Sequence, residues 1–138
     1  MLSRKLSETT FVSEMEIVEI PLGARFTIGC FDLELITLTH SIPEPNAIAL
    51  RTPLGTVIHT GDWKFDPDPV IGEPADEETL RQIGSEGALA VICDSTNVFT
   101  PGESGSEGEI LDNLSKIIAD CTGQVAVACF ASNVARLE

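Results

Sequence analysis

Basic residues are scarce in this sequence, and that scarcity limits what its surface can attract. Lysine and arginine number 8 against 22 aspartates and glutamates, which gives a net charge of −14. Such a charge favours solubility and opposes non-specific binding to nucleic acid or to an anionic membrane, because both are negatively charged. Carboxylates gathered around metal ions would offset this objection only in part. A nucleic-acid-binding role therefore needs a specific local site.

Long apolar runs are also lacking. None approaches the length of about 18 residues that a membrane span needs. The first eight residues, M-L-S-R-K-L-S-E, are charged and have no apolar centre of the kind found in secretory signals. We therefore expect a cytoplasmic protein with no membrane partner. The 138 residues are 43% hydrophobic, which suffices for one core, so the sequence is one domain or a piece of a larger protein.

Metal-binding side chains of the common kinds are few. Histidine occurs only at His40 and His59, whereas most zinc sites use more imidazole or thiolate ligands than these two could supply. The cysteines form no C-x-x-C pair, and three of the four lie in apolar stretches. We expect core thiols in a reducing compartment rather than disulfides or metal ligands. The cysteines are Cys30, Cys93, Cys121 and Cys129.

The hydrophobic pattern predicts antiparallel strands first and strand–helix alternation afterwards. The predicted strands are 13–20, two that meet near Gly29 within 25–40, 47–52, 56–60, 88–94 and 124–130. The last two are nearly continuous apolar runs, as expected of strands covered on both faces. This order predicts an α/β layered fold with a mixed sheet. The sequence pattern changes near residue 100, which predicts a domain boundary there and domains at 1–100 and 101–138.

Helices are predicted from their caps and apolar faces. Residues 1–8 resemble the end of a helix, 74–83 has an acidic first turn, and another helix starts at about 131. Ser106 followed by Glu109 is a capping-box pattern that opens a helix reaching about Cys121. Within that helix four residues share an apolar face, namely Ile110, Leu114, Ile117 and Ile118.

Polar residues follow three of the predicted strands directly. They are His40, Asp62 and Asp94. Strand ends hold side chains rigidly at the edge of a sheet, where they are accessible to a ligand. Imidazole and carboxylate together suit zinc or another divalent ion. The pattern predicts a metal site at this edge, although many α/β proteins carry such residues by chance.

Four short motifs around these residues carry a resemblance to a known family. They are H-S-I-P-E (40–44), H-T-G-D-W-K-F-D (59–66), D-S-T-N (94–97) and F-A-S-N-V-A-R (130–136). Occurring in this order, they resemble ribonuclease J and its relatives, the β-CASP branch of the metallo-β-lactamase superfamily. The resemblance extends from about residue 1 to 136, and the second motif is the most distinctive.

The resemblance implies a role for each strand-end residue. His40 matches a lone histidine ligand, and Asp62 matches an aspartate that bridges two metal ions. Their separation of 22 residues spans the predicted hairpin and returns the chain to the same edge of the sheet. Asp94 matches an acidic catalytic residue beside the metal centre, where it would orient a ligand or the leaving oxygen. The implied activity is hydrolysis of RNA with two zinc ions, which activate a shared water.

The family's H-x-H-x-D-H ligand cluster is absent from this sequence. We therefore expect a fragment, consisting of part of a metallo-β-lactamase-like domain and the start of an inserted β-CASP domain, that is inactive by itself. A half-sheet with exposed edges would be prone to pair with a second copy, forming a homo-oligomer. Two alternatives remain open: a hydrolase of a small ester or thioester, and a non-catalytic scaffold of an RNA-degradation complex.

Other polar residues have both a functional and a structural interpretation. Hydroxyl and amide groups near backbone N–H groups suit phosphate binding, and they are equally good helix caps, the role favoured for Ser132. Lys64 suits either a phosphate or a neighbouring carboxylate. The candidate substrate-binding residues are Lys64, Ser95, Thr96, Asn97, Ser132 and Asn133. Structural roles are predicted for His59, for the core residue Trp63, and for the turn formers Asp66 and Asp68.

Overall fold

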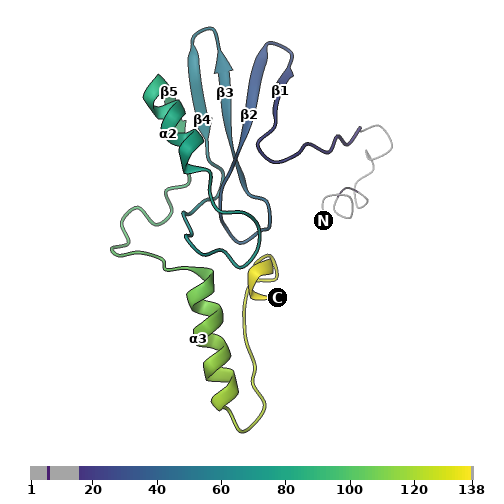
Figure 1. The fold of residues 1–138 in the computed structure, drawn as a ribbon, viewed down its shortest axis with the longest axis vertical. Coiled ribbons are helices and arrows are strands. Elements are labelled where there is room, and N and C mark those ends of the chain that lie inside the picture. Colours follow the sequence, from purple (N-terminus) through teal and green to yellow (C-terminus); the bar gives the residue numbers. More distant parts are fainter. Residues whose placement is uncertain (1–5, 7–15, 138) are drawn as a thin grey trace.

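The computed structural model describes Leu6 and residues 16–137. Its centre is a five-stranded mixed sheet in the order β1-β2-β3-β4-β5, with the first four strands antiparallel and β5 parallel to β4 (Figure 1). This arrangement confirms the predicted α/β fold with a mixed sheet. The strands are β1 (Arg25–Ile28), β2 (Phe31–Thr37), β3 (Asn46–Thr52), β4 (Gly55–His59) and β5 (Ala88–Ile92).

Two hairpins build the antiparallel part of the sheet, as the sequence predicts. Gly29 turns β1 into β2 with a backbone φ of +60°, a conformation that favours glycine. β3 and β4 are joined by a tight turn at Pro53 and Leu54, and Thr52 pairs with Gly55 at its base. β2 ends at Thr37 rather than at His40, and Thr39 forms an isolated bridge with Lys64 instead.

Helix α2 (Glu77–Glu86) covers one face of the sheet. Asp76 caps its first turn, where the carboxylate accepts a hydrogen bond from the backbone N–H of Thr79 at 3.0 Å. Ile83 is 2% exposed and packs with Ile36 and Ile58 of the sheet, and Trp63 packs against this group from the side. The core therefore lies between α2 and the sheet, directly above the loops that leave the strand ends.

Helix α3 (Glu107–Asp120) extends away from the sheet, and the chain returns beside it to the short 3-10 helix η2 (Val134–Arg136) (Figure 1). The predicted capping box is present, because Ser106 accepts from the Glu109 N–H at 3.0 Å and the Glu109 carboxylate accepts from the Ser106 N–H. No residue of α3 is fully buried. Its attachment to the sheet is therefore confined to its first turn and the loops around it.

Several predicted elements are wrong. Residues 124–130 are extended and exposed but pair with no strand among the described residues, and β5 is a fully exposed edge strand. Both sequences are apolar enough for a buried strand, but the described part of the chain places no layer over them. Residues 16–20 form no strand, and only η2 follows residue 131. The helix predicted at 1–8 lies outside the described residues, apart from Leu6.

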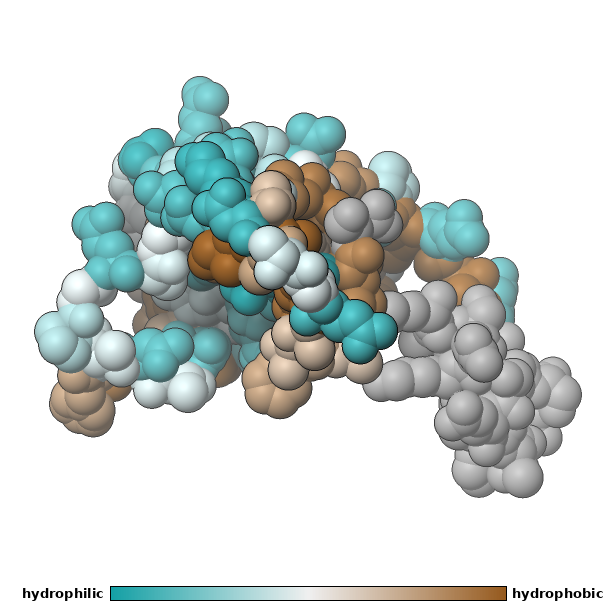
Figure 2. All heavy atoms as spheres, turned by 90° about the horizontal axis from the view of Figure 1, so that it is seen from below, coloured by the Kyte–Doolittle hydropathy of each residue, from teal (hydrophilic) through white to brown (hydrophobic). Residues whose placement is uncertain are grey.

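The cysteine prediction is also wrong as to burial. All four thiols are free and exposed rather than buried in the core, and two of them, Cys93 and Cys129, lie next to or within the uncovered apolar segments. Large apolar side chains are exposed as well, among them Leu89 at 65%, Val91 at 58% and Phe130 at 85%. Figure 2 shows hydrophobic side chains at the surface when the molecule is seen from below. No helix in the described ranges is long and apolar enough to cross a membrane.

Candidate metal-binding pocket at the strand ends

The structure brings His40 and Asp62 into one cavity. The segment after β2 and the segment after β4 lie together, because the Lys64 N–H donates to the Thr39 carbonyl at 3.0 Å and the Thr39 hydroxyl donates to the Lys64 carbonyl at 2.6 Å. This pairing sets His40 against Asp62 at the rim of a cavity of about 380 Å³. An adjoining cavity of about 340 Å³ also contains both residues.

Asp94 lies near this pair, at the end of β5. The indole N–H of Trp63 donates to the Asp94 carbonyl at 3.1 Å, which ties the end of β5 to the segment that carries Asp62. Hydrogen bonds from the Thr96 hydroxyl and backbone N–H lower the pKa of the Asp94 carboxyl, and the charge of His40 lowers it further. Asp94 is therefore close enough to His40 for an electrostatic effect, but it lines neither of the two cavities that contain His40 and Asp62.

Ser132 and Asn133 form part of the wall of the same cavity. The Val134 N–H donates to the Ser41 carbonyl at 3.0 Å, and this bond holds the start of η2 against the loop that follows His40. The side chain of Ser132 caps no helix, contrary to the capping prediction, because η2 begins after Asn133 and has no side-chain cap. The side-chain oxygen of Asn133 is buried and has no hydrogen-bond partner.

The cations beside the cavity are already paired with carboxylates. The Lys64 ammonium lies 3.0 Å from Asp66 and 3.5 Å from Glu107, and the Arg136 guanidinium lies 2.7 Å from Glu107. Lys64 therefore shows the carboxylate pairing that was one of its two predicted roles. With these charges balanced, Asp62 and Asp94 leave the region negative, so it favours a cation over a free phosphate.

Asp66 is more than a turn former. Its side chain accepts from the Asp68 N–H at 3.0 Å, as a turn residue does, and also from the Glu107 N–H at 2.9 Å. Burial opposes its ionisation, but these N–H groups and the Lys64 ammonium together hold the pKa of Asp66 below its usual value. Asp66 thus connects the loop after β4 to the start of α3.

Some predicted residues lie elsewhere. None of Ser95, Thr96 and Asn97 lines either cavity, although Thr96 holds Asp94. His59 is exposed on β4, where its Nδ1 accepts from the Gly61 N–H at 3.1 Å, which agrees with a structural role. Sequence reasoning missed Glu107, which lines the cavity, because a first-turn glutamate has an ordinary explanation in the helix dipole.

The residues that the structure describes do not complete a metal site. Protein zinc sites use three or four protein ligands, whereas the cavity offers His40 and Asp62, and its other carboxylate, Glu107, is paired with Lys64 and Arg136. Within Leu6 and residues 16–137, no group of three or more His, Cys, Asp or Glu side chains could hold a metal ion. The two side chains are suitable donors, but their number does not fit an independent zinc site.

Comparison with known proteins relates the chain to a family. The chain is 47% identical to a ribonuclease J of Sinorhizobium meliloti over all 138 of its residues, which span 24% of that protein. It is 41% identical to a ribonuclease J of Thermus thermophilus over 121 residues, which are 87% of the chain and 21% of the relative. No family model matches the chain.

A solved structure supports the fold independently. A crystal structure of a protein of unknown function from Enterococcus faecalis superposes with a TM-score of 0.65, covering 88% of this chain and 30% of the other at 17% identity. This likeness concerns the fold alone. The two relatives show that the chain belongs to the ribonuclease J-like proteins, and it spans between a fifth and a quarter of the length of these two.

Proposed function

We propose that this chain is part of an RNA-hydrolysing metalloenzyme of the β-CASP branch of the metallo-β-lactamase superfamily, acting in the cytoplasm. The observation that carries the proposal is that His40 and Asp62, which are 22 residues apart in sequence, line one cavity. The names of the relatives favour RNA over a small ester or thioester as the substrate. Residues 1–100 would belong to the metallo-β-lactamase-like domain, and 101–138 would begin the β-CASP domain.

His40 and Asp62 would be two ligands of a zinc centre whose other ligands come from parts of the protein that this sequence does not span. Such a centre supplies an activated water and stabilises negative charge on a phosphodiester. Asp94, held by Thr96, would orient groups beside it. Because the described region is negative and its cations are paired, a polyanion such as RNA would need this positive charge in order to bind.

A chimera tests the proposal. The chain replaces the segment of the Sinorhizobium meliloti ribonuclease J that it matches, and cleavage of a labelled RNA is compared with that by the Asp62→Asn chimera. We expect Asp62→Asn to lower the cleavage rate by at least about 100-fold, as removal of a metal ligand does. Asp112→Asn, an exposed change on α3, is the matched control and should have no effect. Equal rates for the two variants would contradict the assignment of Asp62.

The chain by itself should not cleave RNA. Its donor set in the described region is incomplete, so the purified 138-residue chain is expected to show no zinc-dependent cleavage of the same labelled RNA. Cleavage that requires zinc and disappears with a chelator would show that this sequence holds a complete centre.

A further inference from the structure

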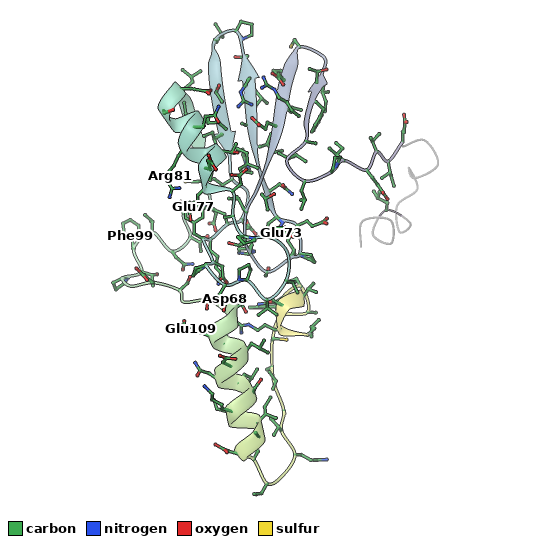
Figure 3. The ribbon with its side chains drawn as sticks, viewed as in Figure 1. Asp68, Glu73, Glu77, Arg81, Phe99 and Glu109 are labelled. Carbon is green, nitrogen blue, oxygen red and sulfur yellow. The ribbon has the colours of Figure 1, made fainter. Side chains whose placement is uncertain are left out.

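Helix α3 and η2 are attached to the strand-end loops by polar contacts. The Glu107 N–H donates to the Asp66 carboxylate at 2.9 Å, and the Gly108 N–H donates to the Asp68 carbonyl at 3.0 Å. Figure 3 shows Asp68 at this junction, just above the first turn of α3. A Cβ at Gly108 would lie 1.9 Å from the Asp68 carboxylate and 3.2 Å from the Asp68 carbonyl oxygen, so α3 packs tightly on this loop.

The Glu107 carboxylate contacts both η2 and the loop after β4. It accepts two hydrogen bonds from Arg136 of η2, at 2.7 and 3.2 Å, and its other neighbour is the Lys64 ammonium at 3.5 Å. The hydrogen bond from Arg136 lowers the pKa of Glu107 below its usual value, against the effect of burial. The side chain is 13% exposed, so water competes little for these bonds. Glu107 thus ties α3, η2 and the loop after β4 together.

A continuous path of contacts runs from Glu107 to His40. Arg136 lies in η2, the first residue of η2 donates its N–H to the Ser41 carbonyl at 3.0 Å, and the Ser41 hydroxyl lies 3.1 Å from the His40 Nδ1. Ser132 and Asn133, which precede η2, form part of the wall of the same cavity. The position of this wall therefore depends on how η2 is held.

We propose that Glu107 is a positioning residue: by clamping Arg136 and Lys64 together it holds η2, and with it Ser132 and Asn133, in place in the wall of the cavity that His40 and Asp62 also line. That this geometry matters for catalysis rests on the proposed function. The clamp, meaning the contacts of Glu107 with Arg136 and Lys64 that hold η2, does not depend on that function. If Glu107 only complemented the dipole of α3, neutralising it would leave η2 unaffected.

Nuclear magnetic resonance of the two histidine rings tests the clamp, because the chain has only His40 and His59. We expect Glu107→Gln to shift the ring signals of His40, through Ser41, and to leave those of His59 unchanged. Glu78→Gln is the matched control: it neutralises a first-turn acid of α2 that has no ion pair among the described contacts. Unchanged His40 signals in Glu107→Gln would overturn the proposal.

Amide hydrogen exchange on the same variants separates a local effect from unfolding. We expect residues 131–137 to exchange about tenfold faster in Glu107→Gln, while β2–β4 keep their protection. Arg136→Gln should reproduce this effect, the double variant should add little to it, and Glu107→Asp should restore part of the protection. Faster exchange spread evenly over the sheet and η2 would show a general stabilising role and contradict the clamp. Neither measurement uses metal or RNA, so failure of the clamp and failure of the proposed function are distinguishable.

Discussion

Gly72 lies against the loop that follows His40, and only a residue without a side chain fits there. Its backbone φ is +81°, and a Cβ at this position would be 2.2 Å from the carbonyl oxygen of Pro43. That oxygen belongs to the backbone and cannot move aside without shifting the loop, which also carries Ser41. A single glycine thus helps to set the position of the segment next to the cavity.

Replacing Gly72 with alanine should therefore be costly. We expect Gly72→Ala to lower the free energy of unfolding by about 2–3 kcal/mol, because it adds both backbone strain and a steric clash. Gly84→Ala in α2 is the control, since a Cβ there meets nothing within 4 Å. It should raise the free energy of unfolding by up to about 1 kcal/mol. Urea denaturation of the 138-residue chain measures both, and equal effects would contradict this account.

For single residues, the sequence predicts that the strand-end residues lie together, but it does not predict the residues that hold them in place. His40 and Asp62 could be predicted because each follows a strand, and strand ends on one edge of a sheet are neighbours. Glu107 and Asp66 could not, because their partners are brought close only by the path of the chain between β4 and α3. Their sequence neighbourhoods, a helix start and an Asp-Pro turn, have sufficient local explanations.

Among the elements, α3 depends on charged groups for its attachment to the sheet. Asp66 and Glu107 both have pKa values below their usual ranges in the folded chain. Their ionised forms are therefore favoured by folding, and the stability that they contribute is complete above their unfolded pKa values of about 4. That stability is lost as the pH falls through the lower folded values.

The lowered pKa values of Asp66 and Glu107 predict how stability changes at acidic pH. The double variant Asp66→Asn/Glu107→Gln should be less stable than the natural chain at pH 6, and the difference should shrink progressively as the pH falls below the unfolded pKa values of about 4. Denaturant midpoints measured from pH 6 to pH 2.5 provide the test. Glu78→Gln should show no such convergence, because its carboxylate has no ion pair among the described residues. A difference that stays constant with pH would contradict the role of these charges.

Local sequence signals were sufficient for some elements and not for others. The hairpins and the capping box of α3 are set by neighbouring residues, and these predictions are confirmed. The strand predicted at 124–130 needs a partner strand, and a strand's partner is not encoded in its own sequence. The apolar pattern of β5 likewise describes a buried environment that the described part of the chain does not supply.

For the whole molecule, the exposed apolar surface along β5 is the main feature. Its large apolar side chains are exposed, with Leu89 at 65%, Val91 at 58% and Ile92 at 54%. β5 is an edge strand with no charged residue or proline, so it lacks the features that usually prevent edge-to-edge pairing.

We therefore expect the isolated chain to self-associate through β5. Val91→Lys should shift the chain toward the monomer in sedimentation velocity experiments, because a lysine on an edge strand opposes pairing. Ile28→Lys on β1, the opposite edge, is a matched control, since Ile28 is 60% exposed and Val91 58%. It should leave association unchanged. A chain that is monomeric at all concentrations, or equal effects of the two variants, would exclude β5 as the contact.

The metal content of the ribonuclease J chimera tests the central claim most directly, because it reports on His40 and Asp62 without depending on the choice of RNA. Mass spectrometry of the purified chimera should find bound zinc, and His40→Ala and Asp62→Asn should each lower the zinc content, while His59→Ala should not. Unchanged zinc content in both the His40→Ala and Asp62→Asn chimeras would contradict the assignment of this pocket as part of a metal centre.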